Sequence, residues 1–133
     1  MSQENVELVE QLVKAFNSED IELLLSSTHP DFELDVPPEL SAEPDIYRGE
    51  DGMRRYWESF QDAMAEIRIH LDRLCDAGEA VVLAMRLTAK GRRTGIAVEQ
   101  RTAAVWTIRD GKVTRIRAYA SLSEALQAVG LAE

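Results

Sequence analysis

The feature that most constrains this chain is a pair of alternating apolar runs joined by Asp110 and Gly111. The runs cover residues 97–108 and 113–119, and the turn between them suits a hairpin because glycine accepts the positive φ that such turns need. A third alternating run, 80–88, precedes them. The three runs predict consecutive antiparallel strands of one sheet, whose two faces carry different chemistry.

Other segments show helical or strand periodicity. Apolar residues from Val6 to Phe16 recur at three- and four-residue spacing and predict a helix over 3–17. Ser121 and Glu124 form a capping-box pattern, and Gly130 is placed to stop the helix that follows. By the same criteria we predict a helix over 21–26, with Ser18 or Asp20 as its cap, and another helix over 49–64. We predict strands over 32–36 and 67–74. The remaining segments are a turn over 28–31 and a loop over 37–48.

Helices gathered at the start and strands that follow one another in the second half predict an α+β layer architecture with a mostly antiparallel sheet. The 133 residues fit a single domain, residues 1–133. No apolar run approaches the roughly 20 residues of a membrane span, and the N-terminus lacks the basic start and apolar core of a secretory signal. The single cysteine, Cys75, cannot form an internal disulfide, so we expect a cytoplasmic protein.

The charge balance and the motifs exclude several classes of partner. The net charge of −9 would repel nucleic acids and anionic membranes, so we expect neither as a partner. His29 and His70 lie in different segments with no cysteine or acid at ligand spacing, which argues against a metal site. No glycine loop has phosphate-binding spacing and no serine has a nucleophile-elbow context, so we expect no cofactor.

Six segments together carry a resemblance to a known family. They are VKAFNSED (13–20), HPDFELDVP (29–37), YRGEDGMRRYW (47–57), DAGEAVV (76–82), VWTIRDGKVTRI (105–116) and SEALQAVGL (123–131). In this order and spacing the chain resembles SnoaL-like proteins of the NTF2-like (cystatin-like) superfamily, over nearly its whole length. The superfamily contains isomerases, cyclases, hydrolases and non-catalytic binding proteins, so the fold alone does not identify the chemistry.

The resemblance implies a cone, in which the curved sheet wraps around the N-terminal helices and a short helix ends the chain. The cone would hold a mostly apolar pocket that binds an apolar or aromatic metabolite. Alternation divides the strand residues into two sets, and the resemblance assigns one set to the interior. The pocket residues that we predict are Tyr47, Trp57, Met85, Gln100, Thr102 and Trp106.

The other set would form the outer face of the sheet, which commonly forms a dimer in this superfamily. Arginine and tyrosine are enriched in such interfaces, and opposite charges across strands stabilise a ladder. We therefore expect a homodimer through the outer-face residues Arg86, Glu99, Arg101, Arg115, Arg117 and Tyr119.

Asp35 is the candidate catalytic residue. It ends the strand before Pro37, and a matching strand-end aspartate is the general base of the ketosteroid isomerases in this superfamily. An aspartate in an apolar cone can hold a raised pKa and transfer a proton. Glu33 has the same strand parity. Leu12 and Ala104 stand where those isomerases carry their two oxyanion donors, so isomerisation by that mechanism is not expected.

Two functions follow as hypotheses. In the first, the protein binds a small apolar or aromatic molecule and acts as a cofactor-free isomerase, cyclase or hydrolase, with Asp35 as acid and base. In the second, it is a non-catalytic ligand-binding or protein-interaction module of the same fold. The missing oxyanion donors favour the second, whereas Asp35, Gln100 and Thr102 favour the first.

Overall fold

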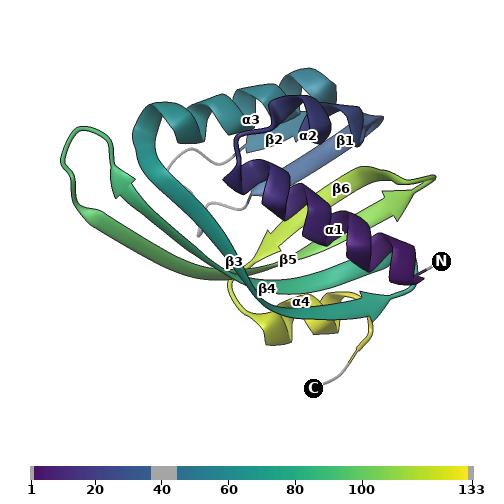
Figure 1. Ribbon diagram of the computed structural model, residues 1–133. Coiled ribbons are helices and arrows are strands. Elements are labelled where there is room, and N and C mark those ends of the chain that lie inside the picture. The colour runs from purple at the N-terminus through teal and green to yellow at the C-terminus, as the bar shows by residue number, and fades with distance from the viewer. Residues whose placement is uncertain (1, 37–44, 132–133) are drawn as a thin grey trace.

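In the computed structural model, which describes residues 2–36 and 45–131, six strands form one open, curved sheet with helices on both faces (Figure 1). The order of the strands across the sheet is β2-β1-β6-β5-β4-β3. The pair β1 and β6 is parallel and the other four pairs are antiparallel, which confirms the predicted α+β class. Along the chain the elements are α1 (Ser2–Asn17), α2 (Ile21–Ser26), β1 (Thr28–Val36), β2 (Asp45–Arg48), α3 (Gly49–Ala63), β3 (Met64–Ala77), β4 (Ala80–Gly91), β5 (Ala97–Arg109), β6 (Lys112–Tyr119) and α4 (Leu122–Ala128).

The N-terminal helices form where their spacing and caps predict. Of the two caps considered, it is Asp20 that precedes α2, and its carboxylate accepts a hydrogen bond of 3.2 Å from the amide of Leu23. Asn17 ends α1 and ties it to the edge strand β3: its side chain accepts from the amide of Ile69 at 2.7 Å and donates to the carbonyl of Ile69 at 2.9 Å. This pair of bonds fixes α1 against the sheet.

The first half of the sheet differs from the sequence-based expectation. The turn predicted over 28–31 is wrong, because β1 already begins at Thr28, where it pairs with Val113 of β6. The predicted loop over 37–48 ends in a strand, since β2 pairs with β1 from Val36 opposite Asp45 to Glu33 opposite Arg48. The rest of that loop, 37–44, lies outside the described residues.

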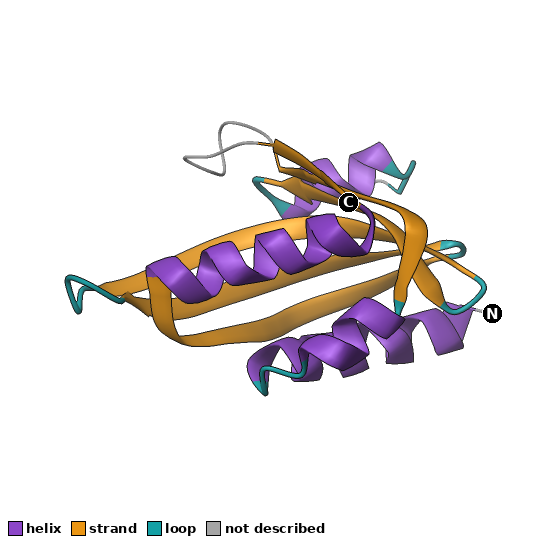
Figure 2. Cartoon of the chain, turned by 90° about the horizontal axis from the view of Figure 1, so that it is seen from above, coloured by secondary structure: helices purple, strands orange, loops and turns teal. Residues whose placement is uncertain are grey.

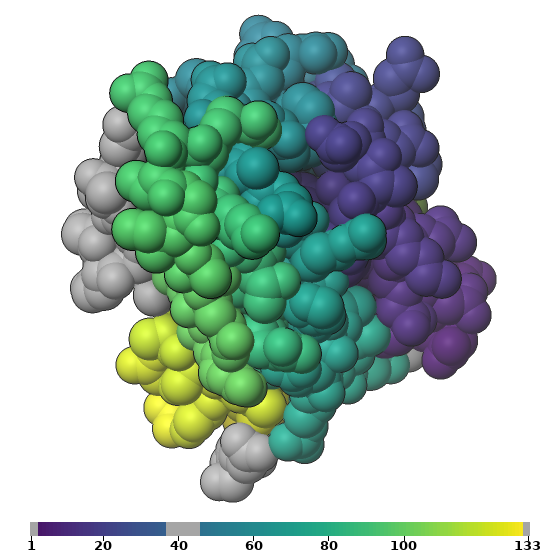
Figure 3. Space-filling view, turned by 60° about the vertical axis from the view of Figure 1, so that its left-hand side comes forward, coloured from purple at the N-terminus to yellow at the C-terminus, as the bar shows by residue number. Residues whose placement is uncertain are grey.

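The second half of the sheet consists of the hairpins that the alternation predicts. Asp110 and Gly111 both have positive φ, 53° and 74°, as a two-residue hairpin turn requires. The strands β3, β4 and β5 are all longer than predicted, and the hairpin of β4 and β5 extends past the helices to a loop at one end of the molecule (Figure 2). The space-filling view shows this hairpin in green beside the teal residues of α3 and β3 (Figure 3).

Apolar side chains gather on both faces of the sheet. The helix-side core lies between the sheet and the first three helices, and the α4 cluster lies between the sheet and α4. Alternation assigns neighbouring residues to different cores: Val81 and Leu83 of β4 belong to the helix-side core, and Val82 belongs to the α4 cluster. The buried members of the helix-side core are Val9, Leu12, Val13, Ala15, Leu24, Phe32, Leu34, Tyr47, Met53, Val81, Leu83, Ala104, Ile108, Val113 and Ile116, and those of the α4 cluster are Val82, Ala103, Val105, Ala125 and Leu126.

The C-terminal helix has the predicted caps. The hydroxyl of Ser121 accepts a hydrogen bond of 3.2 Å from the amide of Glu124, and Gly130 adopts φ of 79° after the last turn. The helix packs its Ala125 and Leu126 on the side of the sheet opposite to the other helices. None of the helices in the described residues is long and apolar enough to cross a membrane.

Candidate functional site

One wall of the interior is built by aromatic residues of α3. Met53, Tyr56, Trp57 and Phe60 recur at three- and four-residue spacing. Met53 belongs to the helix-side core, and Tyr56 and Trp57 pack against it. The ring of Tyr56 meets the edge of Phe60 at a centroid distance of 5.0 Å and that of Tyr47 at 5.2 Å. Edge-to-face pairs of this kind stabilise an aromatic surface beyond the burial of its area. The wall is therefore a continuous aromatic surface that links β2 to α3.

The opposite wall is the inner face of the sheet. Trp106 of β5 pairs with Val81 on one side and Ile116 on the other, both in the helix-side core. Met85 of β4 lies on the same face. Trp106 and Met85 pack against the core but are only partly buried. The sheet thus presents large apolar side chains that are in contact with the core and still accessible from one side.

The structure brings together four of the six predicted pocket residues. Tyr47 is a buried member of the helix-side core, and Trp57, Met85 and Trp106 pack against it. Thr102 has the expected parity, because it pairs with Met85, but it is only partly buried. Gln100 pairs with Leu87 nearer the end of the hairpin and is exposed. The role of these two polar residues in a pocket stays a prediction.

Two hydrogen-bond donors of the interior have no partner among the residues that the structure describes. They are the buried indole nitrogens Nε1 of Trp57 and Trp106. Burial also raises the pKa of the Tyr56 phenol well above its ordinary value of 10.0, and the neighbouring Tyr47 adds to the shift. Tyr56 therefore stays neutral to a higher pH than an exposed tyrosine does. The interior combines aromatic rings, two unused N–H groups and a neutral phenol.

Asp35 lies on the other face of β1. Its neighbours Leu34 and Val36 pack in and against the helix-side core, so strand alternation turns the Asp35 side chain to the outer face of the sheet. There its carboxylate lies 3.6 Å from Nη1 of Arg117, the residue directly opposite on β6. This placement differs from the aspartate in an apolar cone expected from the resemblance. The catalytic role of Asp35 stays a prediction, but its carboxylate does not face the aromatic walls.

Glu33 shares the outer face with Asp35, as their common parity indicates. Its carboxylate lies 3.9 Å from Arg48 on β2, so the two acids pair with different arginines on neighbouring strands. The positions compared with the isomerase oxyanion donors, Leu12 and Ala104, are both buried in the helix-side core. Neither side chain can donate a hydrogen bond.

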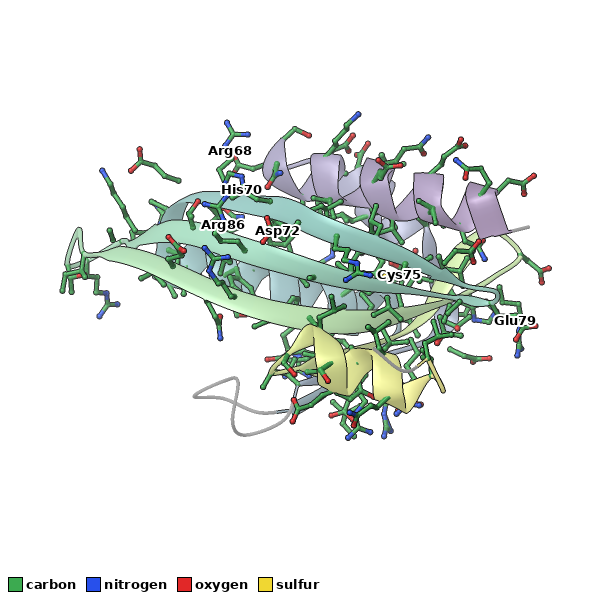
Figure 4. All side chains as sticks on the ribbon, turned by 90° about the horizontal axis from the view of Figure 1, so that it is seen from below. Arg68, His70, Asp72, Cys75, Glu79 and Arg86 are labelled. Atoms are coloured by element: carbon green, nitrogen blue, oxygen red, sulfur yellow. The ribbon has the colours of Figure 1, made fainter. Side chains whose placement is uncertain are left out.

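The helix α4 covers part of the outer face of the sheet. All six residues predicted for the dimer surface lie on this face, and Tyr119 packs beside the α4 cluster. Figure 4 shows Arg68, His70, Asp72 and Arg86 along β3 and β4 on the part that α4 leaves uncovered. The amphipathic stripe of 122–129 predicted a helix correctly, but periodicity alone could not tell which face of the sheet the helix would cover.

Two cavities open at the ends of the sheet. One, of about 320 Å³, lies near the loop of the β4–β5 hairpin and is lined by both strands and Glu66. The other, of about 730 Å³, lies between the first half of α1 and the turns at Gly78 and Gly111. Neither is lined by the predicted pocket residues. Within residues 2–36 and 45–131, no group of three or more histidine, cysteine or acidic side chains is arranged to hold a metal ion.

Comparisons with known proteins agree with this architecture. A family model described as the SnoaL-like domain matches residues 9–116. The crystal structure of an NTF2-like protein of unknown function from Burkholderia pseudomallei has a TM-score of 0.79 at 19% identity, over 96% of this chain and 98% of that one. TerC co-crystallised with polyporic acid has a TM-score of 0.78 at 23% identity, over 95% and 98% of the two chains.

An LEH-like epoxide hydrolase from M. tuberculosis has a TM-score of 0.74 at 16% identity, over 96% of this chain and 90% of that one. At these identities the likeness establishes the fold and not the chemistry. No curated protein matches the sequence.

Proposed function

This chain belongs to the SnoaL-like domain family, and we propose that it binds a small apolar or aromatic molecule between α3 and the inner face of the sheet. The observation that carries the proposal is the set of large apolar side chains that pack against the helix-side core but stay only partly buried. The set comprises Phe16, Tyr56, Trp57, Met85 and Trp106.

The chemistry of these residues fits such a ligand. Small-molecule sites are mostly apolar and aromatic, with a few polar groups that orient the ligand. Here the aromatic rings come from α1, α3 and β5, and the polar groups are the indole N–H groups and the Tyr56 phenol. A relative in fold, TerC, was co-crystallised with polyporic acid, so this architecture can be studied together with an organic ligand.

We propose binding rather than proton transfer as the function of the interior. A base that acts on the ligand must lie within hydrogen-bond reach of the proton that it removes. Asp35 faces the other side of β1 and is paired with Arg117. Among the described residues the buried polar side chains are those of Ser27, Thr28 and Tyr47, so no buried carboxylate or histidine replaces it there.

Ligand titration with two readouts tests the proposal. Both tryptophans of the chain lie in the proposed site, so their intrinsic fluorescence should change when phenolic and polyketide-like compounds bind. A compound at a hundred times its Kd should raise the free energy of unfolding by about 2.7 kcal/mol. The same titration is then made on Trp106→Ala and on Val82→Ala, which removes a buried side chain from the α4 cluster on the other face.

We expect Trp106→Ala to lose the stabilisation by ligand and Val82→Ala to keep it, although both variants are less stable than the wild type. The proposal is wrong if no compound of the panel changes either readout. It is equally wrong if Trp106→Ala binds as tightly as the wild type, because the ligand would then lie elsewhere.

A further inference from the structure

The C-terminal end of α3 is held by a residue of another element, Arg92 in the loop of the β4–β5 hairpin. Its Nε and Nη2 atoms donate to the carbonyl of Gln61 at 2.9 Å and to the carbonyl of Met64 at 3.1 Å. Its backbone amide donates to the carbonyl of Ala63 at 3.0 Å. The last carbonyls of a helix have no partner within the helix, so other groups must satisfy them. Arg92 supplies three such hydrogen bonds where α3 passes into β3.

The charge of Arg92 suits this position as well. The negative end of a helix dipole is stabilised by a nearby positive charge. The last turn of α3 contains no basic residue and carries the acidic Asp62. Arg92 thus provides from the hairpin the cation that the end of α3 lacks. The Arg92 side chain is exposed, so water competes for its hydrogen bonds and the contact is weak enough to open.

The hairpin tip, residues 91–96, is a turn with hydrogen bonds of its own. The amide of Gly91 donates to the carbonyl of Ile96 at 2.9 Å, and the amide of Gly95 donates to the carbonyl of Gly91 at 2.8 Å. The hydroxyl of Thr94 accepts from the amide of Ile96 at 3.1 Å. Because these bonds lie within the hairpin tip, it can separate from α3 without unfolding.

We propose that the hairpin tip is a releasable latch on α3, and that Arg92 is the positioning residue that keeps the aromatic wall against the sheet. Phe60 directly precedes Gln61, whose carbonyl Arg92 binds, and Trp57 lies about one helical turn before it. When the bonds of Arg92 open, the last turn of α3 moves away from the sheet and exposes these two rings. The role of this opening in ligand entry rests on the proposed function, whereas the latch itself is tested without a ligand.

Acrylamide quenching of tryptophan fluorescence is the first test. The indole nitrogens of Trp57 and Trp106 are both buried, so quenching by this small neutral molecule reports how often the interior opens. Arg92→Ala removes the side-chain bonds, and Arg92→Lys keeps the charge without the forked donors. Arg93→Ala is the matched control, because Arg93 is the neighbouring exposed arginine of the same hairpin tip.

Amide hydrogen exchange in the wild type is the second test, so the outcome does not depend on whether the variants fold. The amide of Met64 donates to the carbonyl of Phe60 at the end of α3, and Val82 lies within β4, between two neighbouring strands. A local opening exposes the Met64 amide with little dependence on urea. The Val82 amide exchanges through global unfolding, which depends strongly on urea.

We expect Arg92→Ala to raise the quenching constant and to speed exchange of the Met64 amide about three- to tenfold, as the loss of exposed hydrogen bonds and of a charge at a helix end implies. Arg92→Lys should be intermediate, and Arg93→Ala should match the wild type. The inference is wrong if Arg92→Ala is quenched as weakly as the wild type. It is also wrong if the Met64 and Val82 amides depend equally on urea, because α3 then opens only in global unfolding. If the latch behaves as expected but no compound of the panel binds, the proposed function alone is contradicted.

Discussion

At the scale of single residues, the Tyr56 phenol links the burial of the interior to the dependence of stability on pH. Its pKa is raised in the folded protein, whereas in the unfolded chain it ionises near the ordinary value of 10.0. The unfolded chain therefore loses this proton first, and the stability that depends on it is complete below pH 10 and decreases above it.

We predict that the free energy of unfolding decreases above pH 10 with a contribution from Tyr56 of about 1.4 kcal/mol per pH unit. Tyr56→Phe should remove this contribution and give a shallower slope. Urea unfolding at a series of pH values measures both slopes. Equal slopes for the wild type and the variant would show that Tyr56 is open to solvent.

Asp35 tests the assignment of the two faces of β1. We predict that Asp35→Asn leaves the affinity for an interior ligand unchanged, because its carboxylate points to the outer face and pairs with Arg117. The loss of stability should be at most about 1 kcal/mol, since the arginine is exposed and such pairs contribute little. Fluorescence titration and urea unfolding measure the two effects.

The matched variant for Asp35→Asn is Arg117→Gln, which should have the same small effect and no additional effect when the two are combined. A marked loss of ligand affinity in Asp35→Asn alone would contradict the placement of Asp35 on the outer face.

At the scale of the elements, the contact between α3 and β2 depends on Gly52. A Cβ atom at this position would lie 2.7 Å from the backbone carbonyl carbon of Tyr47, closer than real Cβ atoms approach. The helix can therefore lie on β2 only where it has no side chain. This close approach brings the edge of the sheet to the aromatic wall of α3.

We predict that Gly52→Ala destabilises the protein by roughly 1–3 kcal/mol, as overpacked substitutions do. The direction of this change in the free energy of unfolding is informative, because the same exchange inside an exposed helix stabilises the helix by about 1 kcal/mol. Thermal and urea unfolding measure the change. A stabilised Gly52→Ala variant would show that α3 and β2 are not in this close contact.

Periodicity predicted most elements because their side chains alternate between two environments. The strands β3 and β6 and the helices α1 and α3 each present one apolar face, and the residues of β4 and β5 alternate between the two cores, so the period is visible in the sequence. The four residues of β2 show no such pattern, because Ile46 and Tyr47 are both apolar although Ile46 is exposed and Tyr47 is buried. Their strand geometry comes from pairing with β1. Short edge strands of this kind depend on tertiary context.

In the candidate site, too, the sequence predicted some features and not others. Alternation together with the resemblance predicted that Trp106 and Met85 share one face, and that face is the interior. Asp35 was assigned to the interior by its resemblance to the general base of the ketosteroid isomerases, although the alternation of Leu34 and Val36 already placed it on the other face. The unpartnered state of the indole N–H groups depends on three-dimensional packing, and no sequence pattern reports it.

At the scale of the whole molecule, the outer face beyond α4 remains a candidate homodimer surface. Arg101 lies there with Asp72 at 3.9 Å and Glu99 at 3.5 Å, and Arg86 is directly opposite it on β4. Like charges that face each other across a ladder are destabilising, and Asp72 and Glu99 offset the charge of Arg101 within the chain. Arginine is enriched in protein interfaces, so we keep the proposal of a dimer through this face.

We predict a dimer at micromolar protein concentration in sedimentation analysis, and a monomer for Arg101→Glu with unchanged helical content. The control is Arg109→Glu at the last position of β5, which is also exposed but lies at the end of the sheet. A wild-type monomer, or a dimer that both variants preserve equally, would contradict the proposed surface.

The central claim is that the interior between α3 and the inner face of the sheet binds a small apolar or aromatic molecule. A crystal structure with a bromine-substituted compound of the panel tests it most directly, because the anomalous signal of bromine locates the ligand without ambiguity. We predict one site, in contact with Trp57 and Trp106. A ligand found only in the cavity between α1 and the turns at Gly78 and Gly111, or on the outer face of the sheet, would contradict the claim.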